Sequence, residues 1–399
     1  MTIRITTANA YEAAIGNLQQ RQQDLQLTQD RLTSGKRVQR ASDDPTAAAR
    51  AERALAASAR AVADQRGLEA SRSAMQQTES ALASAGEAMQ QVRELLVAAG
   101  NGSYTDAERN NLAARIRTLR DTIFEAANRG DGAGGYLFGS QGAAQPPFVD
   151  GSGGVQFRGV GGEAVVQGGE MLPMTQDGGA AFLRAHSGNG VFVTTPAAGN
   201  GNGAWIDAGS VSNPSALTGA DYALQFSVSA GVTTYSVLMN GAPTAMTGLP
   251  YVSGQAINID GMTVTVKGTP AQGDRYDLTP STPTLSVFDA LDRVVGELQT
   301  GGRSTAQVAQ TISSGLRDVD ASSVQLQLHR AMAGESLNRI DAVESRLKEK
   351  DLQAQTERSL AEDLDMVQAL SEFQAKQTGY QAALSTYSMV QRLSLFEYL

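Results

Sequence analysis

The chain contains no cysteine and only two histidines among its 399 residues. Without cysteine it has neither disulfides nor thiolate metal ligands, and two histidines argue against a histidine-rich metal centre. We therefore expect no metal and no cofactor. Stability must come from packing.

Positive charge is also in short supply. Lys and Arg number 32 against 41 Asp and Glu, so the formal net charge is -9. This balance argues against a nucleic-acid partner, which is held by neutralising phosphates. No window offers about 18 consecutive apolar residues, so we expect no membrane insertion. The first residues also lack the apolar core of a cleaved secretory signal.

Glycine and proline are scarce in the outer parts of the chain and crowded in its middle. Of the 42 glycines, 30 lie between Gly130 and Gly273, and 10 of the 11 prolines lie between Pro146 and Pro283. Helices do not run through such sequence, whereas short strands joined by tight turns do. We therefore predict an all-β middle between two helical flanks.

Three segments of this middle have the alternation of strands. Residues 222–228, 232–239 and 257–266 alternate apolar with polar side chains and are rich in β-branched and aromatic types. Inside the third segment, Asp260-Gly261 is a pair that supplies the positive φ angles of a two-residue hairpin turn. These signals predict antiparallel hairpins.

The flanks repeat apolar residues every seven positions, which is typical of helices that pack along a seam. The N-terminal flank has two such series: Tyr11, Leu18, Leu25 and Leu32, then Leu68, Met75, Leu82, Met89 and Leu96. The C-terminal flank has two more: Ile312, Val319, Leu326, Ala333, Ile340, Leu347 and Ala354, then Met366, Phe373, Tyr380 and Tyr387 with Leu370 and Leu384 between them. Four seams predict helices that pack against one another.

Helix start signals agree with these series. Asp44 precedes Pro45, so a capping carboxylate stands before a proline at the first helical position. Two further pairs have the spacing of a capping box: Thr105 with Glu108, and Ser304 with Gln307. A helix break near Ser42 is therefore predicted.

Together these patterns predict an α+β multidomain chain in which a long helical coiled-coil or bundle rod, built from both chain ends, carries an inserted, mainly antiparallel β domain. The predicted limits are 1–41 with 358–399 for a terminal coiled-coil domain, 42–140 with 285–357 for the helical rod, and 141–284 for the β domain. The terminal helices have no third segment to bury against, and an isolated helix pair is marginal in water. We infer that neighbouring subunits stabilise them.

Catalytic chemistry finds little support. His329 falls inside the helical series from Ile312 to Ala354, where we expect a position on the helix surface, and His186 lies in a Gly/Ser-rich stretch, where we expect a loop. The Gly-rich strings lack the flanking strand, helix and Gly-Lys-Ser/Thr ending of a phosphate loop. Trp205 is the one feature of the β region that suggests a ligand, and it is more simply explained by packing. We predict that the chain is not an enzyme.

Two motifs now identify a resemblance. Residues 32–37 (LTSGKR), followed by 41–45 (ASDDP), resemble the signature of the flagellin-like family between its first two helices, and residues 360–399 resemble the family's C-terminal helix and tail. Within the family, residues 135–139 (GYLFG), 146–148 (PPF) and 268–278 (GTPAQGDRYDL) are similar to the members that lie at the junction between hook and filament.

The resemblance implies a structural component of the bacterial flagellum. Copies of the chain would form an adaptor ring that joins the hook, through a first hook-associated protein, to flagellin. The chain would leave the cell through the flagellar type III channel, be extracellular, and meet a cytoplasmic export chaperone on its C-terminal helix. A filament-forming flagellin is the alternative, and an enzyme or ligand-binding module inserted in the β region is a third hypothesis.

Candidate residues follow from the seams and the motifs. The predicted subunit interface consists of Tyr11, Leu18, Leu25, Leu32, Met366, Leu370, Phe373, Tyr380, Leu384, Tyr387, Leu395 and Phe396. The family signature consists of Leu32, Ser34, Gly35, Lys36, Arg37, Asp43, Asp44 and Pro45. No catalytic, cofactor or metal residue is predicted.

Overall fold

A computed structural model describes residues 7–139, 145–160, 165–167 and 171–396, without the side chains of 7–11, 165–167, 171 and 390–396. The chain forms two compact units, residues 1–66 with 343–399 and residues 67–342. Seven α-helices are described: α1 (Thr7–Ser34), α2 (Pro45–Ala99), α3 (Asp106–Ala127), α4 (Gly178–Phe182), α5 (Val287–Gln299), α6 (Thr305–Glu362) and α7 (Met366–Phe396).

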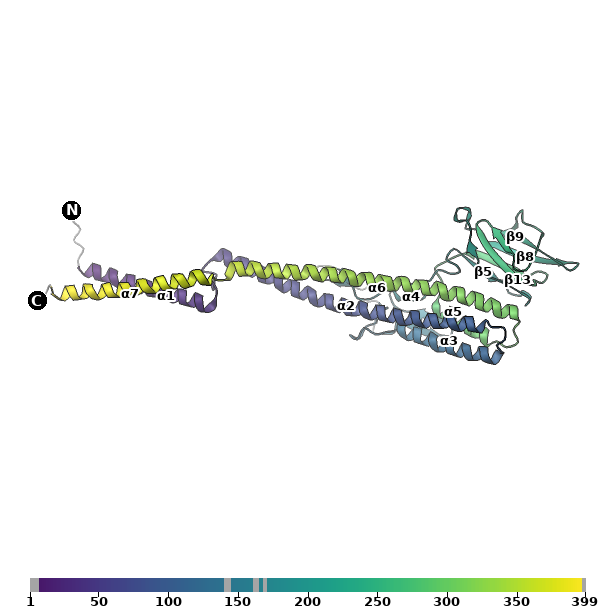
Figure 1. Cartoon of the computed structure of the whole chain (residues 1–399), viewed down its shortest axis with the longest axis horizontal. Coiled ribbons are helices and arrows are strands. Elements are labelled where there is room, and N and C mark those ends of the chain that lie inside the picture. The colour runs from purple at the N-terminus through teal and green to yellow at the C-terminus, as the bar shows by residue number, and fades with distance from the viewer. Residues whose placement is uncertain (1–6, 140–144, 161–164, 168–170, 397–399) are drawn as a thin grey trace. The chain divides into compact units, whose positions relative to one another are not determined.

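The first unit is helical. In it α1 lies against α7, so the first and the last helix of the chain lie side by side (Figure 1). The first turns of α2 and the last turns of α6 complete the unit, joined for example by Ser58, whose Oγ donates to Asp351 Oδ1 at 2.5 Å. Because the chain leaves this unit on α2 and returns on α6, its two terminal segments fold together.

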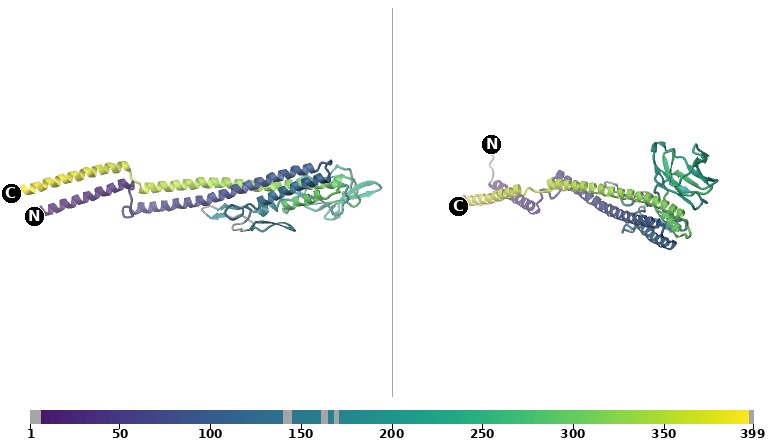
Figure 2. Two further views of the ribbon diagram at one scale, coloured as in Figure 1. Left: turned by 90° about the horizontal axis from the view of Figure 1, so that it is seen from below. Right: turned by 45° about the vertical axis from the view of Figure 1, so that its right-hand side comes forward.

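The second unit begins with an antiparallel helix pair. Residue numbers rise along α2 and fall along α6 in the ion pairs Arg72–Asp341, Glu79–Arg330 and Arg93–Asp320. Two views show α2 and α6 side by side here, with α3 and α5 next to them (Figure 2). The seven-residue series of α2 from Leu68 to Leu96 is fully buried, as is the α6 series from Ile312 to Ala354, which extends into the first unit. The spacing prediction is therefore confirmed residue by residue.

The predicted helix starts are also confirmed. Asp44 Oδ1 accepts from the amide of Ala47 at 3.0 Å, and α2 begins at Pro45. A full capping box joins Thr105 and Glu108 at the start of α3. The same reciprocal pair of hydrogen bonds joins Ser304 and Gln307 before α6. Each bond satisfies an amide that the first helical turn leaves without a partner.

Two short hairpins precede the main sheets: β1 (Phe148–Gly151) with β2 (Gly154–Phe157), and β3 (Val165–Gln167) with β4 (Met171–Pro173). Phe148 of β1 packs edge-on against Phe182 of α4 and lies close to Phe288 of α5. Arg120 of α3 lies over the Phe288 ring and binds Asp150 of β1 at 2.5 Å. Aromatic burial and one buried guanidinium thus hold the first hairpin on the helices.

The remaining strands form the inserted β domain, which lies beside the first half of α6 (Figures 1 and 2). Its described strands are β5 (Phe192–Pro196), β6 (Ala204–Ile206), β7 (Ser210–Val211), β8 (Tyr222–Ser229), β9 (Val232–Met239), β10 (Ala242–Pro243), β11 (Leu249–Pro250), β12 (Ala256–Ile259), β13 (Met262–Gly268) and β14 (Arg275–Pro280). A 3-10 turn spans Pro214–Ala216.

Within this domain the described pairings are all antiparallel, in the orders β10-β9-β8-β14-β5, with β11 also on β9, and β12-β13-β6, with β7 also on β13. The core between the sheets includes Phe226, Tyr276 and Ile257. Alternating side chains of β12 and β13 face it, as the sequence pattern predicts. The fold class predicted from sequence is confirmed.

Three two-residue hairpin turns in this domain have two consecutive positive φ angles. Asp260-Gly261 joins β12 to β13, as predicted, and Asn240-Gly241 joins β9 to β10. The third turn, Ala230-Gly231 between β8 and β9, has an alanine at φ 50°. Because a Cβ penalises this conformation and Asn tolerates it better, Ala230 holds a strained position.

Replacing Ala230 should therefore stabilise the β domain. We expect Ala230→Asn to raise the free energy of unfolding by about 1 kcal/mol, because the left-handed conformation is less strained for Asn. Urea unfolding followed by tryptophan fluorescence would measure this, since Trp205 lies in β6. Ala242→Asn, an exposed change in β10 where φ is not positive, is the control and should give no gain.

The structure corrects two predictions made from the sequence, one for His329 and one for the middle of the chain. His329 does not lie on the helix surface: it is buried under α4, with its ring Nε2 3.3 Å from Gln325 Nε2, and burial lowers the pKa of its imidazole. The middle of the chain is not purely β, since α4 interrupts it. His186 does lie in an exposed loop, as expected.

Candidate assembly surfaces

The terminal helix pair buries its apolar side chains only in part. On α1, Leu18, Leu25 and Leu32 are half-buried, and on α7 Phe373 and Tyr380 are as well. Ala369 is the fully buried apolar residue of α7 among the side chains described. Two helices alone cannot surround a large side chain, so the seam residues come together but stay partly in contact with solvent. The side chains of Tyr11, Leu395 and Phe396 lie outside the described residues; Tyr387 is half-buried.

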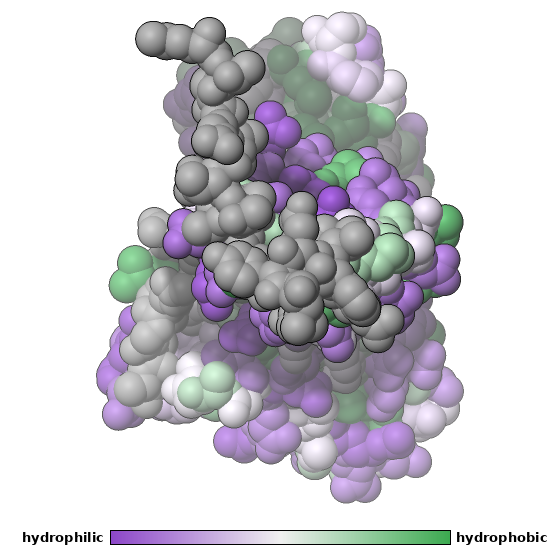
Figure 3. Space-filling view, turned by 90° about the vertical axis from the view of Figure 1, so that its left-hand side faces the viewer, coloured by the Kyte–Doolittle hydropathy of each residue, from purple (hydrophilic) through white to green (hydrophobic). Residues whose placement is uncertain are grey.

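A second set of apolar side chains on α7 is exposed to solvent. Val367 is 83% exposed and Leu370 52%. Met366, Leu370 and Leu384 share one side of the helix, because spacings of four and fourteen residues are close to whole turns. Viewed from the terminal end, hydrophobic residues (green) lie at the surface among hydrophilic ones (Figure 3). We call Met366, Val367, Leu370 and Leu384 the α7 stripe.

The family-signature residues build the connection between α1 and α2. Gly35, at φ 67°, ends α1, and its carbonyl accepts from the amide of Leu364 at 2.9 Å. The Lys36 ammonium binds Glu362 Oε2 at 2.6 Å, and the amide of Arg37 donates to the carbonyl of the same glutamate at 2.7 Å. The signature thus ties the end of α1 to the end of α6. Leu32 and Ser34 close α1, and Pro45 opens α2.

Two carboxylates hold the turn before α2. Asp43 accepts from the amides of Gln39 and Arg40, and these hydrogen bonds lower the pKa of its carboxyl. Asp44 accepts from the amide of Ala47 and also binds Arg37 at 3.2 Å, which lowers its pKa to about 2. Hydrogen bonds to the ionised form favour that form. The turn is therefore held by hydrogen bonds from backbone amides to ionised carboxylates and by the ion pair between Asp44 and Arg37.

The turn should consequently loosen in acid. A carboxyl whose pKa is depressed in the folded state stabilises the fold above its ordinary value of 3.8 and loses that effect as the pH falls to about 2. We expect amide exchange at residues 39–47 to accelerate between about pH 4 and 2. Asp44→Asn, which keeps a capping oxygen but does not titrate, should reduce this change. Equal pH dependence in both proteins would contradict the assignment.

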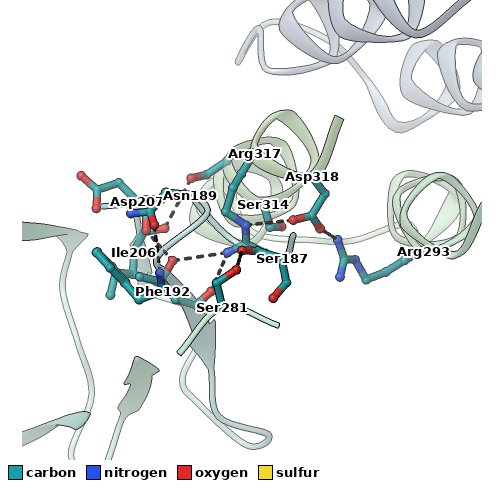
Figure 4. Close-up of polar contacts among 12 residues, drawn as sticks. Ser187, Asn189, Phe192, Ile206, Asp207, Ser281, Arg293, Ser314, Arg317 and Asp318 are labelled. Carbon is teal, nitrogen blue, oxygen red and sulfur yellow. Dashed lines mark hydrogen bonds and ion pairs between the residues drawn. The ribbon is translucent and has the colours of Figure 1, made fainter. Parts of the chain in front are cut away.

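A polar junction joins the β domain to the helices of the second unit (Figure 4). Asp318 of α6, 1% exposed, accepts from Arg317 Nε at 2.9 Å and also pairs with Arg293 of α5. The Arg317 Nη1 atom donates to the carbonyl of Thr194 in β5 at 2.7 Å. This chain of contacts, which we call the Asp318 junction, connects α5, α6 and β5.

Among the described His, Asp and Glu side chains, no group of three is placed to hold a metal ion. No described helix is long and apolar enough to cross a membrane. Trp205 is half-buried in β6, with Lys267 Nζ 5.2 Å from its ring centre. The strongest functional features of the described part are thus surfaces and junctions.

Sequence reasoning missed the Asp318 junction and the burial of His329. For His329 a signal was present: it stands three positions after Leu326, as the buried Ser322 stands three after Val319. At these two places the position three residues after a seam residue of α6 is thus also buried, although it carries a polar side chain. For Asp318 no such signal exists, because its burial depends on the packing of α5 and β5 against α6, through Arg293 and through the contact of Arg317 with Thr194.

Comparison with known proteins gives matches in both sequence and structure. The model of the bacterial flagellin N-terminal helical region matches residues 5–143. Flagellar hook-associated protein 3 of Salmonella typhimurium (strain LT2) is 30% identical over 152 residues, 38% of this chain and 48% of that protein. The chain thus spans about half the length of the curated relatives it matches.

Solved structures match over more of the chain. FlgL of Xanthomonas campestris is 28% identical with a TM-score of 0.67, covering 76% of this chain and 98% of that one. Flagellar hook associated protein-3 of Legionella pneumophila is 25% identical with a TM-score of 0.68, covering 74% and 94%. The similarity therefore extends well beyond the N-terminal helices.

Proposed function

We propose that the chain, which is similar to flagellar hook-associated protein 3 and to the flagellin N-terminal helical region, is a structural adaptor at the junction between flagellar hook and filament. The observation that carries this proposal is the match to almost the whole of the Xanthomonas campestris FlgL structure. The match to the N-terminal helical region does not carry it, because that match by itself would fit a flagellin equally well.

Assembly through the terminal helices is the second part of the proposal. Copies of the chain form a ring, with the first hook-associated protein on one side and flagellin on the other. The α7 stripe and the half-buried seams of α1 and α7 support this, because apolar surface of this kind is removed from water by association. The predicted domain limits and the interface residues named from sequence are retained as proposals.

Export is the third part. We propose that the chain passes through the flagellar type III channel without a cleaved signal peptide and acts outside the cell. A cytoplasmic export chaperone would cover α7 beforehand, where Met366 is exposed and Phe373 and Tyr380 are half-buried. The relatives are flagellar structural proteins by name, and we propose no catalytic role for this chain.

The test is electron microscopy of cells that lack the chain, with the culture medium assayed for flagellin. Hooks without filaments and flagellin in the medium are the expected result. Hooks that still carry filaments would overturn the proposal. Long filaments grown by the purified protein alone on seeds would favour the alternative, a filament-forming flagellin. Reproducible turnover by the isolated β region would favour an inserted enzyme.

A further inference from the structure

A groove of about 560 Å³ opens in the first unit between the first turns of α2 and the last turns of α6. Its lining includes Arg50 and Arg53 from α2 and Glu357 and Leu360 from α6. Leu360 is 79% exposed although it borders a groove. The groove therefore offers an occupant two guanidiniums on its α2 side, and apolar surface beside the Glu357 carboxylate on its α6 side.

The two arginines lack a carboxylate partner within the described part of the chain. Arg53 Nε donates to the carbonyl of Ala49 in its own helix at 3.1 Å, and both side chains are exposed. By contrast, Arg37 at the other border of the groove is occupied by Asp44. A guanidinium presents a planar fork of donors that suits a carboxylate, so Arg50 and Arg53 are positioned for an acidic partner.

A surface of complementary character lies where α6 passes into α7. Asp363 and Asp365 are exposed, and no described Lys or Arg forms an ion pair with either. Their bonds are local: Asp363 accepts from Ser359, and Asp365 caps the amides of Val367 and Gln368. Val367, the most exposed large apolar side chain described, lies two residues after Asp365. We call Asp363, Asp365 and Val367 the acidic knob.

We propose that the acidic knob of one copy of the chain seats in the arginine groove of the next copy. The two surfaces match in kind: among the described residues, two carboxylates without a cationic partner meet two guanidiniums without a carboxylate partner, and Val367 meets Leu360. The inference rests on the proposed ring and names a contact within it.

The contact is head-to-tail in symmetry, since each copy offers a groove to one neighbour and a knob to the other. Contacts of this kind generate rings when the rotation closes. Opposite charges placed this way guide the approach of the correct face and disfavour a reversed one. The apolar contact between Val367 and Leu360 adds buried area, and salt does not weaken it as it weakens the attraction between the charges.

Charge reversal with complementation tests the proposal in cells that lack the natural chain. The groove variant carries Arg50→Glu and Arg53→Glu. The knob variant carries Asp363→Lys and Asp365→Asn, because Asn retains the cap of α7. Each variant alone should lower the fraction of hooks that carry filaments at least about tenfold, because like charges then face each other.

The decisive arm expresses one chain that carries all four substitutions together. Every reversed groove then meets a reversed knob of the next copy, whatever the number of copies, so filaments should return to near the natural level. If either variant alone supports filaments, or if the four substitutions together do not restore them, the contact is wrong. If the natural chain itself fails to restore filaments, the proposed function fails instead. Unchanged melting temperatures of the purified variants confirm that each one folds.

Discussion

Cells that carry Leu370→Asp in place of the natural residue should form hooks without filaments, while the purified variant melts as the natural protein does. Leu370 is 52% exposed in the single chain, so the carboxylate is solvated there and the monomer loses little. In an assembled ring the same carboxylate would be buried without a partner, which is unfavourable by several kcal/mol. We expect the fraction of hooks with filaments to fall at least about tenfold.

The matched control is Ala375→Asp. Ala375 is also exposed on α7, but it lies about 140° around the helix from Leu370. It introduces the same charge without entering the α7 stripe and should leave filaments unaffected. Equal loss of filaments in both variants would mean that the stripe is not the assembly surface, and that α7 tolerates no added charge.

The half-buried seam should respond differently. Leu25→Asp and Phe373→Asp place a charge between α1 and α7, so each should block assembly and also separate the terminal helices. Melting of the second unit should stay unchanged, because neither residue belongs to it. Hydrogen exchange along α1 and α7 would separate this double effect from the single effect of Leu370→Asp. Protection of α1 and α7 that persists in both seam variants would contradict the assigned packing.

Asp318→Ala should produce the largest loss of stability in the second unit. It removes the carboxylate that binds Arg317, whose side chain is only 7% exposed, and leaves that guanidinium buried without its partner. Breaking a buried pair from one side typically lowers the free energy of unfolding by about 3–5 kcal/mol. We expect about 3 kcal/mol, because Arg293 is 44% exposed and is solvated when released. Urea unfolding followed by circular dichroism measures it.

Asp320→Ala is the control for this experiment. It breaks the ion pair with Arg93, in which both side chains are about half exposed. A surface pair of that kind contributes about 1 kcal/mol or less. Both variants remove one aspartate from the same stretch of α6, so net charge and helix propensity change alike. Similar losses for the two would show that the Asp318 junction does not anchor the β domain.

The helical part of the fold was predictable in detail because its information is local and periodic. The residues that share the seam of α2 recur every seven positions, and all of them from Leu68 to Leu96 are buried. Caps and hairpin turns are local too, which is why Asp44, Thr105 and Asp260 were identified correctly. Such signals depend on backbone geometry that a few neighbouring residues determine.

The candidate site was predictable only in outline. Seven-residue spacing placed Leu370 and Leu384 among the seam residues of α7, but it could not distinguish the side that meets α1 from the side that remains in solvent. A helix presents the same periodicity to a partner within the chain and to one outside it. Exposure in the folded chain makes that distinction, because it depends on which helix arrives and at what angle.

The sequence alone determined the two helical flanks with a mainly β middle between them, the buried seams of α2 and α6, and the absence of thiol chemistry. Tertiary structure alone decided that Asp318 joins Arg317 to Arg293 and that Arg50 and Arg53 face an open groove. The physical reason is the distance along the sequence over which each kind of signal acts. Periodicity and caps are encoded within a few residues, whereas a buried polar contact needs partners from segments that only the complete fold brings together.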